Sequence, residues 1–200
     1  SVSLSLKTPD AKQRAVVFHR SRAWTDAGSR GYQLLIEDGK LSASLIHFWP
    51  GNAISVKTRQ VIPVNRWVDV AVTYDGSSSA KGISVFIDGK RAEVDLVKDK
   101  LTKNITGGGG NTIAIGARFR DRGFTKGEVS SFQVFDRQIS DLEIALKHDQ
   151  QQTLDQLQKL KGEEEISGVQ RRMLVQHMTL NASDQHAEFR KKLASVRTQL

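Results

Sequence analysis

The first 138 residues alternate apolar and polar side chains with a period of two, and no other feature constrains the fold as strongly. Apolar residues occupy every second position in the stretches 32–36, 68–72 and 83–87. Successive side chains of a β-strand point to opposite faces, so this alternation predicts strands. Two further strands are expected in "TIAIG" (112–116) and "GEVSSFQVF" (127–135).

Turn signals separate these strands. Asp38-Gly39 and Asp88-Gly89 each stand between two apolar runs. Asp-Gly is favoured in tight hairpins because both central residues must adopt positive φ angles. Many short strands joined by such turns predict a mainly β fold, a two-sheet antiparallel jelly-roll sandwich.

The periodicity becomes helical after Arg137. Ser140 is followed three residues later by Glu143, the pattern of a capping box. We expect one helix through 139–160 and two more at 167–180 and 183–199. The chain is thus predicted to contain a jelly-roll sandwich at 1–138 and a helical extension at 139–200. We expect the extension to pack on the sheets or to begin the next segment of a larger protein.

The basic charge belongs to the predicted sandwich. Residues 1–138 contain 21 Lys and Arg against 13 Asp and Glu, whereas residues 139–200 contain nine of each. Such an excess can attract acidic polysaccharide, nucleic acid or another anionic surface, although an ordinary solvated basic surface is the simpler interpretation. No stretch approaches the ~20 apolar residues of a membrane span.

Several kinds of catalytic site are excluded or disfavoured. The absence of cysteine excludes disulfides, thiolate catalysis and cysteine-based zinc sites. Gly107–Gly110 is followed by a predicted strand and by no Lys-Ser/Thr pair, so it predicts a flexible connector and no phosphate-binding loop. Residues 1–138 lack paired carboxylates at Glu-x-Asp-x-Glu spacing, and no two histidines have metal-ligand spacing. We therefore predict no enzyme and no cofactor.

Three clusters are candidate ligand sites. Aromatic rings can stack on sugars or bases, and arginine pairs with anionic groups. The alternatives are that the aromatic residues are core residues and the arginines beside them flank a sheet edge. For the third cluster, the alternative is that the arginines form ion pairs with Asp121 or neighbouring carboxylates. The first cluster is Arg22, Trp24, Asp26 and Arg30, the second is His47 and Trp49, and the third is Arg118, Arg120 and Arg122.

Three segments together resemble a known family. They are "RWVDVAVTYDGSSSAKGISVFIDGKRAE", "TIAIGARF" and "GEVSSFQVFDRQISDLEIALK". Their order and spacing resemble the laminin-G-like branch of the concanavalin A-like lectin/glucanase superfamily, over roughly residues 1–147. Within that branch, the segments 18–59 and 101–124 are similar to a module inserted in large planctomycete-type bacterial proteins that also carry a cytochrome-c-like segment. The resemblance implies a jelly roll, a binding role that is commonly directed at carbohydrate, and an extracytoplasmic location.

One departure from the family concerns calcium. Relatives often have two carboxylates in the last strand that can support a structural calcium, whereas this chain has Ser130 and Ser131 there. Asp26, Asp75 and Asp121 remain as oxygen ligands, and calcium prefers several such groups together. A structural calcium is therefore not favoured.

The sequence thus predicts a noncatalytic module that binds a carbohydrate, an anionic glycan in particular. The first alternative is a scaffold that docks neighbouring domains of its own parent protein without a small ligand. The second is a degenerate glucanase-like hydrolase. A nucleic-acid partner is not favoured, and the sequence leaves the oligomeric state open.

Overall fold

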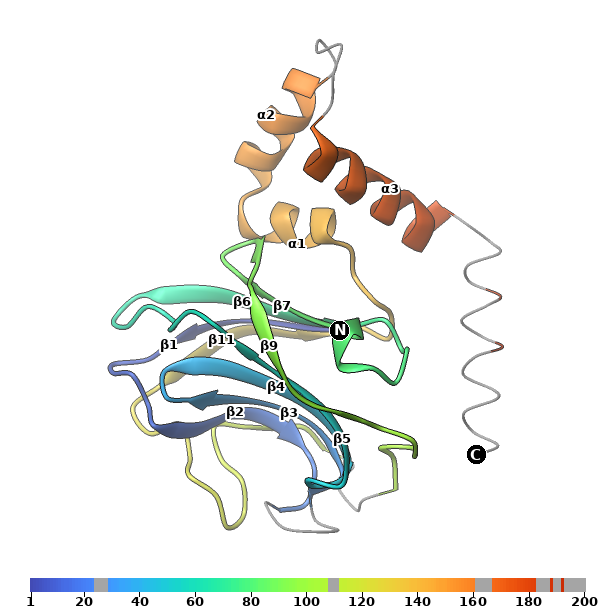
Figure 1. Cartoon of the computed structure of the whole chain (residues 1–200). Coiled ribbons are helices and arrows are strands. Elements are labelled where there is room, and N and C mark those ends of the chain that lie inside the picture. Colours follow the sequence, from blue (N-terminus) through green and yellow to red (C-terminus); the bar gives the residue numbers. More distant parts are fainter. Residues whose placement is uncertain (24–28, 108–111, 161–166, 183–187, 189–191, 193–200) are drawn as a thin grey trace.

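The computed structural model describes residues 1–23, 29–107, 112–160, 167–182, 188 and 192. These residues form two antiparallel β-sheets stacked face to face, with helices beyond one of them (Figure 1). The prediction of a two-sheet jelly-roll sandwich followed by helices is confirmed.

The described strands divide between a five-stranded and a six-stranded sheet. The five-stranded sheet has the order β11 (Glu128–Val134), β1 (Val2–Lys7), β6 (Trp67–Tyr74), β7 (Ile83–Ile87) and β8 (Lys90–Arg91). The six-stranded sheet has the order β10 (Ala114–Ile115), β2 (Arg14–Arg20), β3 (Gly31–Glu37), β4 (Lys40–Phe48), β5 (Asn52–Thr58) and β9 (Val94–Lys100).

The core lies between the two sheets. Phe18 of β2 is at its centre and makes edge-to-face contacts with Tyr32 and Phe132, at centroid distances of 6.4 and 5.3 Å. Aromatic pairs favour this arrangement because ring edges are positive and ring faces negative. Aliphatic residues from both sheets complete the core, among them Leu4, Leu6, Leu34, Ile36, Leu41, Ile54, Val68, Val70 and Val85.

Both predicted hairpins are present. Asp38 and Gly39 have φ angles of 53° and 72°, and they join β3 to β4 with Glu37 opposite Lys40. Asp88 and Gly89 join β7 to β8 in the same way. The angles fit the two-residue turn that matches the twist of paired strands.

The strand predicted at 112–116 is shorter than expected. β10 consists of Ala114 and Ile115, which pair with His19 and Phe18 of β2. Beyond it the chain follows the edge of β2 irregularly, and the Val16 N–H donates to the Arg122 carbonyl at 2.9 Å. The edge of β2 is thus bonded partly to a loop, which becomes important for the candidate site.

The helical part contains α1 (Asp141–His148), α2 (Gln150–Leu160) and α3 (Gly168–Ala182). The single helix predicted through 139–160 is wrong, because Asp149 adopts an extended conformation between α1 and α2. The Asp149 carboxylate accepts a hydrogen bond from the Gln152 N–H at 2.9 Å, which caps the new helix. The helix expected at 183–199 lies almost entirely outside the described residues.

Helix α1 packs on the outer face of the five-stranded sheet (Figure 1). Ile144 of α1 joins a buried cluster with Ala71, Phe86 and Ile139. The capping box is present, because the Ser140 hydroxyl accepts from the Glu143 N–H and the Glu143 carboxylate accepts from the Ser140 N–H. Hydrogen bonds from Arg137 lower the pKa of Glu143 to about 2 against the opposing effect of burial. The helical extension therefore packs on the sandwich through α1.

Replacing Ser140 with alanine should lower the free energy of unfolding by about 1 kcal/mol, because the first turn of α1 loses its cap. The Ser140 side chain is buried and also contacts His177 of α3, so the loss should loosen both helices. Urea unfolding followed by circular dichroism measures the change. Ser130→Ala on an exposed strand position is the control, with an expected change within about 0.5 kcal/mol. Equal stabilities of the two variants would contradict the proposed capping role.

Candidate functional site

The loop at 116–123 lies along the edge of β2, beside the segment that follows β2. Gly123 forms a parallel bridge with Val16, and Phe119 forms a parallel bridge with Ala23. The Gly116 N–H donates to the Val17 carbonyl at 2.9 Å. These backbone contacts place Arg22 of the first predicted cluster next to the third cluster, although the two are about a hundred residues apart in sequence.

A buried ion-pair network holds this loop. The Asp121 carboxylate accepts hydrogen bonds from Arg14 at 2.8 and 3.0 Å and from the Arg118 Nε at 3.1 Å. Arg14 also bonds Glu37 at 2.6 Å, and Arg118 bonds the Gln33 side chain. The side chains of Arg118 and Asp121 are 0% and 2% exposed. Burial alone would raise the pKa of Asp121, but hydrogen bonds from the two arginines lower it to about 2.

This network corrects the interpretation of Arg118, Arg120 and Arg122 as one exposed anion-binding face. Arg118 is buried and paired with Asp121, which was the alternative. Arg120 has a φ of 61°, so the backbone leaves the strand conformation and the three side chains do not alternate as expected. Arg122 is exposed and donates to the Gln13 side chain at 3.0 Å.

Phe119 is the residue that the sequence did not single out. Its side chain is 68% exposed, and the Arg120 guanidinium carbon lies 5.2 Å from the centroid of its ring. In a strand, Phe119 would point to the face opposite its neighbours Arg118 and Arg120, which would be the apolar face. The sequence pattern therefore gave no reason to expect an exposed ring. The loop instead presents an aromatic ring and a cation together at its tip.

His19 shows how closely the loop is fitted to β2. Its Nε2 donates to the Ala117 carbonyl at 3.0 Å, and its Nδ1 accepts from the Ser21 N–H at 3.2 Å. Burial, followed by the nearby charge of Arg118, lowers the pKa of His19 and favours the neutral ring. His19 therefore fastens the loop and belongs to its structural support.

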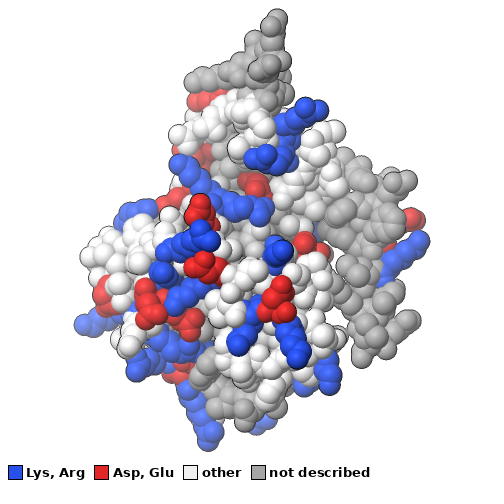
Figure 2. Space-filling model, viewed as in Figure 1, with Lys and Arg blue, Asp and Glu red and all other residues white. Residues whose placement is uncertain are grey.

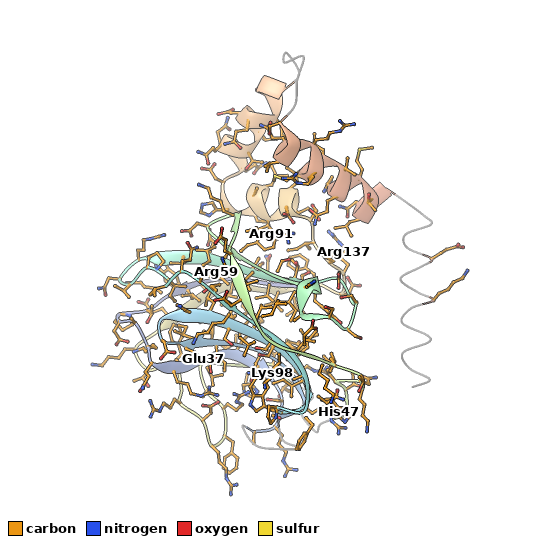
Figure 3. The ribbon with its side chains drawn as sticks, viewed as in Figure 1. Glu37, His47, Arg59, Arg91, Lys98 and Arg137 are labelled. Carbon is orange, nitrogen blue, oxygen red and sulfur yellow. The ribbon has the colours of Figure 1, made fainter. Side chains whose placement is uncertain are left out.

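The second predicted cluster is assembled at the ends of β3 and β4. Arg30 lies 3.2 Å from the His47 Nε2 and 3.4 Å from the His47 carbonyl. The His47 Nδ1 donates to the Asn104 carbonyl at 2.6 Å, and Figure 3 shows His47 at the end of the sandwich away from the helices. Trp49 is partly exposed, and its neighbour Phe48 is 45% exposed. Arg30, His47 and Trp49 therefore occupy one end of the six-stranded sheet.

The remaining predicted residues differ in how far they can be placed. Arg22 is exposed and adjoins Ala23, which bridges to Phe119. Trp24 and Asp26 lie outside the described residues. We define the rim as Arg22, Phe119 and Arg120, which are exposed and lie at the bridge between Ala23 and Phe119.

Charge on the visible face of the molecule is mixed. Figure 2 shows lysine and arginine side chains interleaved with aspartate and glutamate over the sandwich. Ion pairs on the sandwich include Arg59 with Asp95 at 2.8 Å and Lys57 with Asp38 at 3.0 Å. Anion recognition on this face therefore depends on local clusters.

Within the described parts of the chain, no group of three or more histidine, aspartate or glutamate side chains is arranged to hold a metal ion. Of the oxygen ligands considered for calcium, Asp121 is occupied by guanidinium groups, and Asp75 accepts from the Ser77 N–H at 2.8 Å. None of the described helices combines the length and the apolar character needed to cross a bilayer.

The family profile described as concanavalin A-like lectin/glucanases superfamily matches residues 1–145. The chain belongs to this superfamily. The sandwich and the first five residues of α1 fall within the match, whereas α2 and α3 lie beyond it. No curated protein matches the chain in sequence.

Solved structures share the fold of this superfamily member at low sequence identity. A SAP-like pentraxin from Limulus polyphemus is 15% identical with a TM-score of 0.53, over 74% of this chain and 68% of the pentraxin. The CBM40 of a Ruminococcus gnavus IT-sialidase, solved with α2,3-sialyllactose, is 15% identical with a TM-score of 0.55, over 74% and 80%. The binding domain of botulinum neurotoxin serotype G is 13% identical with a TM-score of 0.50, over 75% and 36%. At these identities the likeness concerns the fold.

Proposed function

We propose that this chain is a noncatalytic binding module for an anionic glycan and that the rim is its contact surface. The observation that carries the proposal is the exposed Phe119 ring with the Arg120 guanidinium beside it, on a loop fixed by buried ion pairs. A sugar offers an apolar C–H face for the ring, and its carboxylate or sulfate offers a partner for arginine.

The buried network gives the rim its rigidity. Asp121 connects Arg118 of the loop to Arg14 of β2, so the turn that carries Phe119 and Arg120 is anchored to the sheet. A surface that is ordered before binding loses less conformational entropy when the ligand arrives. Arg22 adds a second cation, because the bridge between Ala23 and Phe119 brings its backbone to the same edge.

The glycan class is favoured over nucleic acid by the distribution of charge. Nucleic-acid binding relies on many phosphate contacts along a continuous basic surface, whereas basic and acidic side chains interleave over the visible face. A small cluster of two arginines and one ring suits one or two acidic sugar residues. The CBM40 neighbour, whose structure contains sialyllactose, has the same fold. We further propose an extracytoplasmic location within a larger exported bacterial protein.

A scaffold that docks other domains of its parent is the second candidate. Apolar side chains on α3 favour it, because Val169, Val175 and Met178 are 59%, 55% and 63% exposed. Exposed apolar residues that form a contiguous patch are typical of a contact surface, and Val175 and Met178 are neighbours on one face of α3. Capture of other fragments of the parent by this chain, lost on replacing Val175 and Met178 with serine, would favour this role.

Replacing Phe119 with alanine should weaken binding to an acidic polysaccharide about tenfold, because the ring supplies stacking and cation–π contacts. Affinity electrophoresis with polygalacturonate, alginate and heparin, and with dextran as a neutral reference, measures this. Arg120→Gln should reduce the preference for the acidic polymers over dextran. The melting temperature of both variants should stay near that of the unmodified chain, since the two side chains are at the loop tip.

Trp67→Ala is the matched control, because Trp67 is an exposed aromatic residue of the five-stranded sheet, with 44% exposure. It should bind the acidic polymers like the unmodified chain. The proposal is wrong if the folded chain binds none of the acidic polymers, or if Phe119→Ala binds them as well as Trp67→Ala does.

A further inference from the structure

A hollow of about 250 Å³ lies on the outer face of the five-stranded sheet, beside the C-terminal end of α1. It is on the opposite sheet from the rim. Residues of β1, β6 and β11 form its floor, and Ile144, Lys147 and His148 of α1 form one side. Seven polar side chains line it: Ser3, Ser5, Asp69, Ser131, Gln133, Lys147 and His148.

The hollow arises from small side chains and from a break in strand register. Ser3 and Ser5 of β1 point to the outer face, where their size leaves room beneath α1. The pairing of β1 with β11 shifts between these two serines. Ser131 lies at the shift with a φ of 53°, an unusual conformation for a residue other than glycine. Such bulges re-aim side chains and are common beside functional sites.

Asp69 and His148 form the polar centre of the hollow. The His148 Nδ1 donates to the Asp69 Oδ2 at 2.7 Å, and the Ser5 hydroxyl donates to the Asp69 Oδ1 at 2.5 Å. The imidazole also rests against Gly89, where an added Cβ would lie 3.1 Å from the ring. In the tautomer that carries its proton on Nδ1, the ring offers Nε2 as a hydrogen-bond acceptor. No described residue hydrogen-bonds this nitrogen.

The charges in the hollow balance. Asp69 supplies one negative charge and Lys147 one positive charge, and Lys147 is held by the Gln133 side chain and by the Phe135 ring at 5.4 Å. A charged ligand would therefore gain little net attraction. A neutral ligand with several hydroxyls fits better, because each hydroxyl can donate to Asp69 or His148 and accept from a serine or Lys147.

We propose that this hollow binds one neutral sugar residue or a polyol of similar size. The volume limits the ligand, because pockets for drug-sized molecules are about 300–1,000 Å³. A single ring with its hydroxyls fits this size, whereas a polysaccharide chain must extend beyond it. The site shares no residue with the rim, so it does not depend on the function proposed above.

Amide shifts in the ¹⁵N-HSQC spectrum of the full chain test this proposal. The probes are methyl glycosides of glucose, galactose and N-acetylglucosamine, together with myo-inositol. At least one probe should produce saturable shifts at Ser5, Asp69, Gln133 and His148. Asp69→Asn removes the charge of the main acceptor and should weaken that binding about tenfold. Ser3→Leu fills the floor and should abolish it.

The controls separate the two sites. Phe119→Ala should leave the shifts around Asp69 unchanged, and Ser3→Leu should leave binding to acidic polysaccharide unchanged. Melting temperatures establish that each variant is folded. The proposal is overturned if none of the four probes shifts these amides in the unmodified chain. It is also overturned if Asp69→Asn and Ser3→Leu bind the shifting probe as tightly as the unmodified chain does.

Discussion

Replacing Asp121 with alanine should lower the free energy of unfolding by about 3–5 kcal/mol, because it leaves a buried arginine without its carboxylate. Arg118 is fully buried and depends on Asp121 for charge compensation, and Arg14 also donates two hydrogen bonds to it. Domains are stable by about 5–15 kcal/mol, so the variant should lose a large part of its stability. Urea unfolding followed by tryptophan fluorescence measures the difference.

Arg122→Ala is the control for Asp121→Ala, since Arg122 belongs to the same loop but is exposed. The free energy of unfolding of Arg122→Ala should stay within about 0.5 kcal/mol of that of the unmodified chain. The pH profile gives an independent readout. The pKa of folded Asp121 is about 2 and its ordinary value is 3.8, so its contribution is complete above pH 4 and is lost as pH falls toward 2. Asp121→Asn should flatten the profile between these pH values. A loss below 1 kcal/mol for Asp121→Ala would contradict the anchoring role.

Replacing Gly31 with alanine should lower the free energy of unfolding by about 3 kcal/mol or more, because the new Cβ would clash with backbone atoms. The position of that Cβ is 1.6 Å from the Arg20 carbonyl oxygen, on the strand that pairs with β3. The φ of 139° is also strained for any residue other than glycine. The strands β2 and β3 would have to separate where they lead into the rim. The loss should appear both in unfolding by urea and in binding to acidic polysaccharide.

Gly116→Ala is a matched control for this effect. Gly116 has a positive φ of 80°, but nothing lies within 4 Å of an added Cβ. It should therefore show only the backbone penalty, about 1–2 kcal/mol. If both variants lose the same stability, the close approach of Arg20 to Gly31 has no energetic consequence and the explanation fails.

The two proposed sites occupy opposite sheets of the sandwich. The rim is at the edge of the six-stranded sheet, and the hollow is under α1 on the five-stranded sheet. Binding at one can therefore be removed by substitution without touching the other. A module with both would hold an acidic glycan at the rim and a neutral sugar residue on its second face.

Local patterns made much of the fold predictable from the sequence. The hairpin at Asp38-Gly39 and the capping box of Ser140 and Glu143 each depend on residues within four positions of one another. The strand alternation is local in the same way, because successive side chains of a strand point to opposite faces. The resemblance over residues 1–147 agrees with the family match over residues 1–145.

One of the failures has a local cause, and the other two involve contacts between distant residues. Asp149 ends α1 although the apolar positions continue through 160, because its carboxylate caps the next helix. Arg118 is buried because Asp121 is bonded to Arg14, which is 107 positions away. The hollow depends on Asp69 meeting His148 across 79 positions, and no short motif indicates such a pairing.

The sequence by itself determined that this chain is a jelly-roll sandwich with helices and that its arginine-rich segments merit attention. Only the tertiary structure decided which of those side chains face solvent. Arg118, Arg120 and Arg122 look equivalent in the sequence, yet the positive φ at Arg120 and the carboxylate of Asp121 separate them. Burial of an arginine depends on a partner that the chain brings from another strand, whereas strand alternation depends on adjacent residues alone.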